Sequence, residues 1–444
     1  MTVENRRRPS GLPPLHEAWL PREHALHRPR HGGRQLTALI CAAVFFVPPV
    51  LSLMFGARPV EIENRRLADF PSPSSGWGFF TGMSRWATDH LVFRSGAVHA
   101  ADGVSQGLFG EPAPFNQGGS DLSGPLSGNR PTGPKEFDLE ENQGTPKQVP
   151  PGAYRKVIEG KDGWLYYGQD FDYKCQPAKS LDQSIAQVRK LREVVEASGR
   201  KFVFVVAPDK STMVPENLPA SFPQKDCWER ASKTFWSRVP AETGAIGLRA
   251  GLEETEKSVQ HAVYHKLDTH WTDEGALALT KLVAENVKPG ITGTWKTRIG
   301  DEWADNADLP PLLARTGKKK GEYYSLLPNG RNDRTQEMNY EYNSRAVHFG
   351  SDAVTGTISD KTMLLGDSFG VTCGRYLAAA FNDLSMAHYQ TLDKKRDEII
   401  STLADQKTIV LQVVERVLSD GTPPILDPAI IDRLGQELQK HPVR

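Results

Sequence analysis

The chain has 444 residues, enough for a substantial core and for one or two domains. Its 54 basic and 54 acidic side chains cancel, and no basic segment with interleaved aromatic residues stands out, as a nucleic-acid surface would require. These properties exclude nucleic acid as an expected partner.

The first element in chain order is an uncharged apolar segment, Leu36 to Phe55 (LTALICAAVFFVPPVLSLMF). Its length matches a bilayer core of roughly 30 Å. Arginines dominate the residues before it, and basic flanks tend to stay in the cytoplasm. We therefore expect a cytoplasmic tail over residues 1–35, a single transmembrane anchor over 36–56, and the rest of the chain outside the cytoplasm. A cleaved signal peptide is the alternative, although no clear small-x-small cleavage site follows the apolar run.

The four cysteines differ in their surroundings. Cys41 lies within the apolar segment and Cys373 follows an apolar strand, so we expect both to be unpaired. Cys175 and Cys227 lie in polar segments on the outward side, where oxidation can occur. We predict a disulfide between these two, with two free thiols as the alternative.

Composition divides the remaining chain. An ordered juxtamembrane segment is expected after the anchor, and the next stretch is rich in Pro, Gly, Ser, Asn and Gln, too poor in large apolar residues to offset its ordering entropy. A folded domain follows, in which the motifs described below predict catalysis. The expected boundaries are a juxtamembrane segment over 57–110, a flexible linker or insertion over 111–152, the catalytic domain over 153–420 and a C-terminal tail over 421–444.

Strands and helices alternate in the catalytic domain. Apolar residues recur at helical spacing in SLDQSIAQVRKLREVVEAS, and KFVFVVAP then reads as a buried strand. Further alternating segments are, in order, the helix GALALTKLVAENV, the strand KTMLLGDS, the helices GVTCGRYLAAAF and DKKRDEIISTLADQ, and the strand KTIVLQVV. This order predicts an α/β fold with a parallel sheet covered on both faces. Functional groups collect at the carboxyl ends of the strands in such sheets.

Ser368 lies at such a strand end, in TMLLGDSFGVTCGRYL. Gly366 permits a tight turn, and the serine hydroxyl is then exposed where the next helix begins. Backbone N–H groups of the first helical turn and the helix dipole are suited to stabilising an oxyanion there. The position is that of a nucleophile. The alternative is that Asp367 or Ser368 simply caps the helix.

A serine nucleophile needs a base, and the base needs an acid to orient it. Asp268 and His270, in HKLDTHWTDEGA, supply both residue types. In an extended segment, residues two apart project to the same side, so both side chains can turn toward Ser368. Trp271 is expected to bury its ring and anchor the loop, with Thr272 as N-cap of the following helix. The alternative is a surface Asp and His that are neighbours by chance.

Other polar residues are assigned more weakly. His261, His265 and His348 would bind a metal only if folding gathered them, so we assign no metal site. No glycine-rich nucleotide loop is apparent, and no cofactor is expected. The run Lys318 to Lys320 is interpreted as a solvated loop, with attraction to an anionic polysaccharide as the alternative.

Together the motifs carry a resemblance. The DTHW segment followed about a hundred residues later by LLGDSFG resembles the AlgJ and AlgX family of alginate O-acetylation proteins. The segments ENRRLADFP, GKDGWLYY, APDKSTMVPENLP and DEWADNADLPPLL are similar to family segments in the same order, so the likeness covers about 61 to 415. It implies a three-layer SGNH hydrolase-like fold in circularly permuted form, in which acid and base precede the nucleophile. By this resemblance Ser368 is the nucleophile, His270 the base and Asp268 the orienting acid.

The resemblance also implies an activity, partners and a location, with a single-pass anchor in the inner membrane and the catalytic domain in the periplasm. The expected reaction transfers acetyl groups onto hydroxyls of an exported polysaccharide through an acetyl-serine intermediate, with a membrane-bound O-acyltransferase delivering the acetyl group. Tyr264 and Lys266 flank the Asp/His motif and are candidate substrate-binding residues. We see no separate carbohydrate-binding module after the last strand, which favours an AlgJ-like architecture. Two alternatives stay open: a carbohydrate acetylesterase outside the cytoplasm, and a non-catalytic scaffold of an exopolysaccharide machine.

Overall fold

The computed structural model describes most of the C-terminal two thirds of the chain. The described residues are 156–313, 315–336 and 344–443, together with 70–73, 76–90, 100, 104 and isolated positions between 36 and 51. The chain divides into two units, Met1–Val60 with Leu67–Arg94 and Glu61–Arg66 with Ser95–Arg444. Most of the expected anchor (36–56) and all of the expected linker (111–152) lie outside the described residues.

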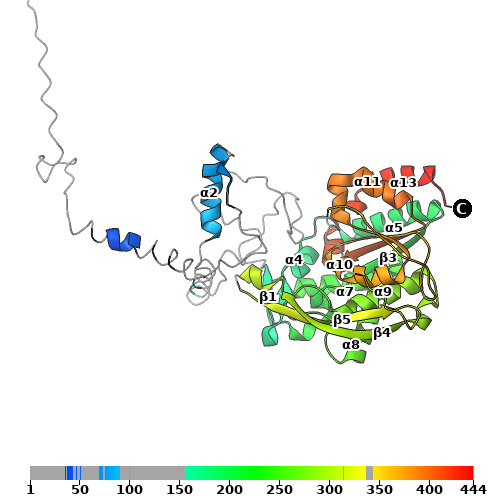
Figure 1. Ribbon diagram of the computed structural model, residues 1–444, viewed down its shortest axis with the longest axis horizontal. Coiled ribbons are helices and arrows are strands. Elements are labelled where there is room, and N and C mark those ends of the chain that lie inside the picture. Colours follow the sequence, from blue (N-terminus) through cyan, green and yellow to red (C-terminus); the bar gives the residue numbers. More distant parts are fainter. Residues whose placement is uncertain are drawn as a thin grey trace, which may run out of the picture. The chain divides into compact units, whose positions relative to one another are not determined.

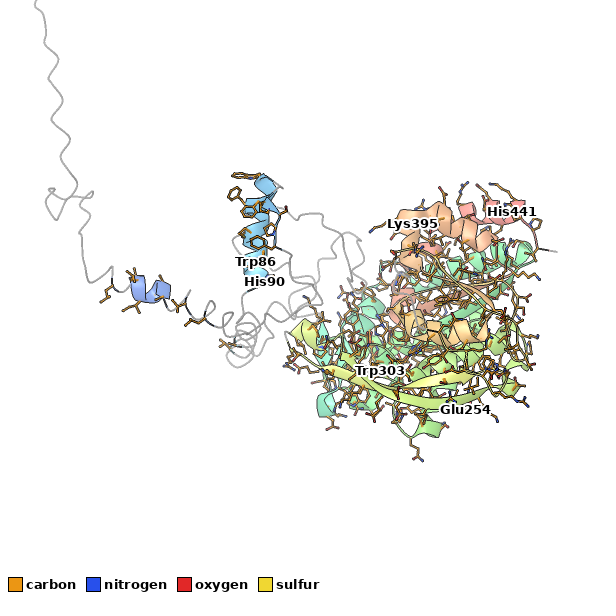
Figure 2. The ribbon with its side chains drawn as sticks, in the orientation of Figure 1. Trp86, His90, Glu254, Trp303, Lys395 and His441 are labelled. Atoms are coloured by element: carbon orange, nitrogen blue, oxygen red, sulfur yellow. A yellow bond between two sulfur atoms is a disulfide. The ribbon has the colours of Figure 1, made fainter. Side chains whose placement is uncertain are left out.

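The smaller unit contains the helix α2 (Trp77–Asp89). Aromatic rings gather on it: Phe70 meets Trp86 edge to face with centroids 5.2 Å apart, and Trp86 stacks on His90 (Figure 2). Within the parts of the chain that the structure describes, no helix combines the length and apolar character that crossing a membrane requires.

The larger unit is built on a five-stranded sheet of order β3-β9-β7-β8-β6. Strand β7 is parallel to both β9 and β8, and β3 is parallel to β9. The strands are β3 Lys201–Ala207, β6 Val347–Gly350, β7 Thr362–Gly366, β8 Asp383–His388 and β9 Thr408–Val414. Every residue of β7 and β9 is buried, as expected for central strands with helices on both faces.

The edge strand β6 differs from the expected all-parallel sheet because it runs antiparallel to β8. Its residues alternate between buried and exposed, a pattern typical of a strand with one face open to solvent. The sheet is therefore mostly parallel.

Helices pack in two sets (Figure 1). Helix α13 contacts both α5 and α11, and α9 contacts both α8 and α10. These helices are α5 Leu181–Ala197, α8 Leu248–Val259, α9 Asp273–Val287, α10 Ser368–Ala380, α11 Leu392–Ala404 and α13 Pro428–Lys440. Figure 1 shows the first set above the sheet and the second below it, so the domain has three layers.

The C-terminal residues differ from the expected tail. Helix α13 begins at Pro428, with Asp427 as its N-cap, and buries Ile430, Ile431, Leu434 and Leu438 in the main core. It packs on α5, where a Cβ at Gly435 would approach the Val194 side chain to 3.0 Å. Apolar residues at helical spacing in 428–440 thus extend the catalytic domain past its predicted end at 420.

Two small antiparallel pairs stand apart from the sheet. Strand β1 (Val157–Glu159) pairs with β2 (Leu165–Tyr167), and β4 (Lys296–Asn306) pairs with β5 (Lys318–Leu327). The long β4–β5 hairpin lies across the lower part of the domain in Figure 1. No strand is predicted for it from the sequence, and the Lys318 to Lys320 run at the start of β5 is interpreted there as a solvated loop. The remaining helices are α4 Gln169–Cys175, α6 Lys210–Met213, α7 Lys225–Thr243 and α12 Glu415–Asp420.

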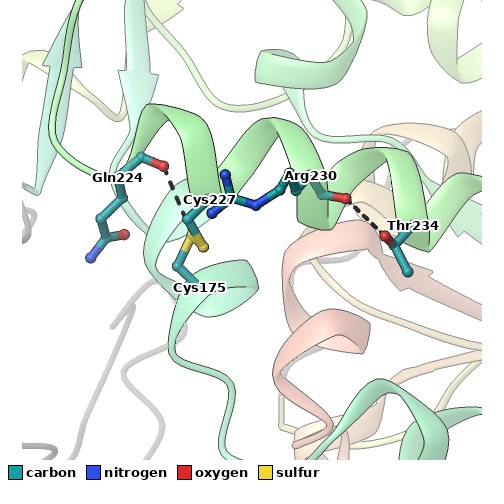
Figure 3. The surroundings of a disulfide bond; sticks show 5 residues. All are labelled: Cys175, Gln224, Cys227, Arg230 and Thr234. Atoms are coloured by element: carbon teal, nitrogen blue, oxygen red, sulfur yellow. Dashed lines mark hydrogen bonds between the residues drawn. A yellow bond between two sulfur atoms is a disulfide. The ribbon is translucent and has the colours of Figure 1, made fainter.

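The predicted disulfide is confirmed. Cys175 at the end of α4 is bonded to Cys227 in the first turn of α7, with Cα atoms 5.9 Å apart (Figure 3). Cys41 and Cys373 are unpaired, and Cys373 is buried. The disulfide therefore joins two helices that are 52 residues apart in sequence.

Candidate active site

Ser368 is the first residue of α10, directly after β7. Asp367, not Ser368, is the N-cap, because its side chain accepts the Phe369 N–H at 3.0 Å. Asp367 is fully buried and also accepts bonds from Gln412 and the Val414 amide of β9. Since the cap is supplied by its neighbour, the Ser368 hydroxyl remains available for other contacts.

His270 provides that contact. Its Nε2 lies 2.9 Å from Ser368 Oγ, and its Nδ1 lies 2.8 Å from Asp268 Oδ1. In the neutral tautomer that donates Nδ1–H to Asp268, Nε2 accepts the serine hydroxyl proton. The structure thus brings together the three side chains that the sequence analysis assigns to a triad, across 98 residues of sequence.

The loop that carries Asp268 and His270 is a bend and not the extended segment we expected. It is closed by a bridge between Tyr264 and Trp271 and by a bond from the His265 amide to the His270 carbonyl. In this bend the His270 amide donates a hydrogen bond to Asp268 Oδ1, at 3.0 Å. That bond holds the Asp268 carboxylate beside the His270 ring.

Trp271 anchors this loop as expected. Its ring is 1% exposed, contacts Phe369 edge to face, and donates Nε1–H to Thr372 on α10. Helix α9 approaches the loop so closely that a Cβ at Gly275 would lie 2.7 Å from Trp271 Cβ. Glycine is therefore required at 275 for this contact. Thr272 precedes α9, although its side chain makes no capping bond.

Two charged residues that the sequence analysis assigns to no site complete the surroundings of the acid. Lys319 of β5 places its Nζ 2.8 Å from Asp268 Oδ2, and the Asp308 amide donates to the same oxygen at 3.1 Å. Asp308 Oδ2 lies 3.4 Å from His270 Nδ1. Lys319 is therefore not part of a solvated loop. We refer to Asp268, His270, Asp308 and Lys319 as the His270 cluster.

The charges of this cluster shift its pKa values. Burial alone raises the pKa of Asp268, but hydrogen bonds and charges from His270 and Lys319 outweigh burial and hold that pKa below its usual range. Burial lowers the pKa of His270, while hydrogen bonds and charges from Asp268 and Asp308 raise it to about 9. The two carboxylates thus make His270 a stronger base than an ordinary histidine.

A second set of buried charges lies at the ends of β3 and β9. Lys174 bridges Asp209 at 2.6 Å and Glu415 at 3.0 Å, and Arg416 contacts Asp209 at 3.0 Å and Asp170 at 3.5 Å. We refer to these five residues as the Asp209 cluster. Burial, followed by the charge of Asp209, raises the pKa of Asp170 to about 7.

Lys210 lies next in sequence to this cluster and reaches the catalytic loop. Its buried Nζ donates to the carbonyl oxygens of Asp268 at 2.7 Å and His265 at 3.1 Å. Burial lowers the pKa of Lys210 to about 8. The lysine therefore ties the loop of His270 to the end of β3.

The two candidate substrate-binding residues differ in environment. The Tyr264 ring is 2% exposed and its hydroxyl donates to the Pro208 carbonyl at 2.5 Å, so it packs between loop and sheet. Lys266 is exposed. Both line a groove of about 700 Å³ between residues 259–274 and the β4–β5 hairpin, which also includes Lys318 to Lys320 and Tyr324. Ser368 does not line this groove, and the binding roles of Tyr264 and Lys266 stay predictions.

Three residues of the His270 cluster lie close enough together to be considered as metal ligands. The ligand atoms of Asp268, His270 and Asp308 lie within 4.8 Å of one another. Both Asp268 oxygens already accept hydrogen bonds, one of them from the Lys319 ammonium. We therefore assign these residues to the ionic cluster and not to a metal.

Comparison with known proteins places this site in a family. The family model for the SGNH hydrolase-like domain of the acetyltransferase AlgX matches residues 157–382, about half of the chain. A probable alginate O-acetylase AlgJ from Pseudomonas syringae pv. tomato is 32% identical over 126 residues, which cover 27% of this chain and 30% of that protein. The alginate biosynthesis protein AlgX of Pseudomonas aeruginosa is 26% identical over 148 residues, covering 32% of this chain and 30% of that protein.

The chain thus spans about a third of the length of these curated relatives. Among solved structures, the O-acetyltransferase domain of Pseudomonas putida AlgJ is similar, with a TM-score of 0.43, 18% identity, and coverage of 63% of this chain and 98% of that one. The family model includes both the Asp268/His270 loop and Ser368. The chain belongs to the AlgX-type family of SGNH hydrolase-like acetyltransferase domains.

Proposed function

We propose that this protein is an O-acetyltransferase that acetylates hydroxyls of an exported polysaccharide, using Ser368 as nucleophile, His270 as base and Asp268 as orienting acid. The observation that carries the proposal is the continuous chain of contacts from Asp268 Oδ1 through His270 to Ser368 Oγ, at 2.8 and 2.9 Å. Relatives named as probable alginate O-acetylases support the acetyl group as the one transferred.

In the first half-reaction, neutral His270 takes the Ser368 proton while Oγ attacks the carbonyl carbon of an acetyl donor. The tetrahedral oxyanion needs hydrogen-bond donors. The Phe369 and Gly370 amides are directed to Asp367, which corrects the expectation that the whole first turn is available. The Ser368 amide has no hydrogen-bond partner within the described part of the chain, so it is our candidate donor.

Collapse of the intermediate forms acetyl-Ser368, and His270 returns its proton to the leaving group. In the second half-reaction a sugar hydroxyl gives its proton to His270 and attacks the acetyl carbon. When the second tetrahedral intermediate collapses, the bond between the acetyl carbon and Ser368 Oγ breaks and His270 returns the proton to Oγ, which leaves free Ser368 and an acetylated sugar. Asp268 keeps the imidazole in the tautomer that both steps need and stabilises the imidazolium.

The proposal extends to location and partners. The apolar segment Leu36 to Phe55 and its arginine-rich flank support an inner-membrane anchor with the catalytic domain in the periplasm. Acetyl-CoA is a cytoplasmic compound, so a membrane-bound O-acyltransferase would supply acetyl groups across the membrane. Protease treatment of spheroplasts tests this topology: the catalytic domain should be digested, and its protection until lysis would contradict the proposal.

The activity is tested by incubating the full chain with a chromogenic acetyl ester and candidate oligosaccharides. Mass spectrometry should find acetylated sugar with the natural sequence and none with Ser368→Ala. Ser237→Ala, at an exposed position on α7, is the matched control and should retain transfer. Transfer that survives Ser368→Ala would exclude the serine as nucleophile.

Two other functions use the same fold. A carbohydrate acetylesterase would share the triad and pass the acetyl group to water, so ester hydrolysis that no sugar redirects would favour it. A non-catalytic scaffold would tolerate Ser368→Ala in a polysaccharide acetylation assay in cells. The 2.9 Å contact between His270 and Ser368 favours either enzyme over the scaffold.

A further inference from the structure

The β4–β5 hairpin holds the outer oxygen of the catalytic acid. Asp268 Oδ1 faces His270, while Oδ2 accepts bonds from the Lys319 ammonium and the Asp308 amide. Asp268 is fully buried, and the Lys319 side chain is 17% exposed. An ammonium in this position neutralises the side of the carboxylate that the imidazole does not use.

The Asp308 carboxylate holds the residue between the acid and the base. It accepts the Thr269 amide at 2.8 Å through Oδ1 and the Thr269 hydroxyl through Oδ2. Asp308 Oδ2 is also 3.4 Å from His270 Nδ1. Asp308 and Lys319, from opposite ends of the hairpin connection, therefore contact all three consecutive residues Asp268 to His270.

The other charges near His270 come from different elements. Lys210 on α6 donates to the Asp268 carbonyl, and His265 precedes the bend. Burial lowers the pKa of His265 to about 4, so it is neutral near pH 7. The negative charges of Asp268 and Asp308 raise the pKa of His270. The positive charges of Lys319 and Lys210 act to lower it.

We propose that Asp308 and Lys319 are positioning residues through which the hairpin sets the orientation of His270 and, from opposite sides, the ease with which it gives up its proton. Neither residue touches the substrate in this account, because each acts through Asp268, Thr269 or His270. The inference deepens the proposed function, on which it rests for the role of His270 as a base.

The two residues should have opposite effects. Lys319→Met removes a positive charge beside Asp268, which leaves that carboxylate freer to stabilise the imidazolium, so the pKa of His270 should rise by about one unit. Asp308→Asn removes a negative charge 3.4 Å from Nδ1 and should lower it by about one unit. A residue that only stabilises the fold has no reason to produce shifts of opposite sign.

The test is an NMR titration of histidine side chains in the full chain labelled on histidine, with His270→Gln used to assign the His270 signal. The same variants are assayed for hydrolysis of a chromogenic acetyl ester from pH 6 to 10. Lys319→Met should move the His270 titration and the rising limb of activity to higher pH, and Asp308→Asn should move both to lower pH. Lys319→Arg should restore the position of the natural sequence.

Exposed neighbours on the hairpin give matched controls. Lys320→Met and Asp301→Asn remove the same charges from solvent-facing positions on β5 and β4, and should shift the titration little. Thermal unfolding of each variant identifies those that fail to fold, for which Lys319→Gln and Asp308→Ser serve as second variants.

The outcome separates this inference from the proposed function. Shifts of opposite sign in the NMR titration without ester hydrolysis would support the positioning role and count against the enzyme. The opposite outcome is also possible: Ser368→Ala abolishes hydrolysis, but His270 has the same pKa in Lys319→Met, Asp308→Asn and their controls. That result would overturn the inference and leave the proposed enzymatic function intact. Shifts in the same direction for both variants would also overturn it.

Discussion

Two groups of buried charges lie at the carboxyl side of the same sheet, and they differ in what they can reach. In the Asp209 cluster, the side chains of Lys174, Asp209 and Glu415 are at most 1% exposed. In the His270 cluster, His270 is 11% exposed and adjoins the partly exposed Ser368. Buried charge with a perturbed pKa is found in both. Among these two clusters, the His270 cluster alone adjoins a nucleophile and is accessible to solvent. We therefore place the chemistry at the His270 cluster.

The Asp209 cluster has a structural explanation instead. Its charges connect α4, the second residue after β3 and the first turn of α12. They therefore join α12 to segments that lie more than 200 residues earlier in the sequence. Such pairs strongly destabilise a protein when one partner is removed. The comparison therefore predicts that substitutions divide into those that abolish activity and those that weaken the fold.

The largest expected effect is on activity at Ser368. Ser368→Ala should reduce acetyl-ester turnover by about 10³-fold or more, since no other group near His270 Nε2 replaces the nucleophile. The free energy of unfolding in urea should change little, because Asp367 supplies the helix cap. If Ser368→Ala also lowers the free energy of unfolding strongly, the proposed difference between a catalytic cluster and a structural cluster is contradicted.

The Asp209 cluster should show the reverse. Lys174→Met leaves Asp209 and Glu415 without their shared cation, and the free energy of unfolding should fall by about 3–5 kcal/mol. Urea denaturation measures this loss. Turnover per folded molecule should stay within a few-fold of the natural sequence; a 10³-fold loss in a variant that remains folded would give this cluster a catalytic role.

The disulfide beside Lys174 should contribute less to the free energy of unfolding than Lys174 itself. Replacing Cys175 and Cys227 by serine opens a loop of 52 residues, and stability should fall by about 2–4 kcal/mol. Thermal unfolding with and without a reducing agent measures the effect in the natural sequence. If reduction leaves the unfolding temperature unchanged, α4 and α7 are held together by other contacts.

The most gradual of the expected effects is the pH dependence of the His270 cluster. Asp268 and Asp308 raise the pKa of His270 to about 9, and only the neutral imidazole accepts the Ser368 proton. Below this value, turnover of a chromogenic acetyl ester should therefore rise about tenfold per pH unit. A rate that is flat from pH 7 to 9 would show that His270 is already neutral there.

The same pKa shift predicts a change in stability with the opposite sign. Because the folded state holds the His270 proton more tightly than the unfolded chain, this contribution is complete below pH 6.5, the ordinary histidine value, and is lost as pH rises toward about 9. Unfolding in urea at pH 6 and pH 9, compared with His270→Gln, isolates it. Equal pH dependence in both proteins would contradict the raised pKa.

Sequence patterns predict the central strands and the Asp268/His270 motif well because both depend on local signals. Buried runs of Val, Leu and Ile mark β3, β7 and β9, and a serine after such a run falls at a strand end. Asp268 and His270 lie close in sequence. The remaining question, whether His270 meets Ser368, depends on tertiary structure and is answered by the 2.9 Å contact.

Lys319 and Asp308 could not be found in this way. Their partners lie 51 and 40 residues earlier in the chain, and a run of three lysines normally indicates a solvated surface. One local signal was present: in a strand, the middle residue of such a run points away from its neighbours. Lys318 and Lys320 are exposed and Lys319 faces inward, but recognising this required identifying β5 first.

Intact-protein mass spectrometry can show whether Ser368 carries the acetyl group. The full chain is mixed with a chromogenic acetyl ester and quenched in acid within the first turnovers, and peptide mapping locates any added acetyl group. We predict one acetyl group on Ser368, absent from Ser368→Ala and strongly reduced in His270→Gln. Turnover of the ester with no acetyl on Ser368, or an acetyl group that persists elsewhere in Ser368→Ala, would contradict the account.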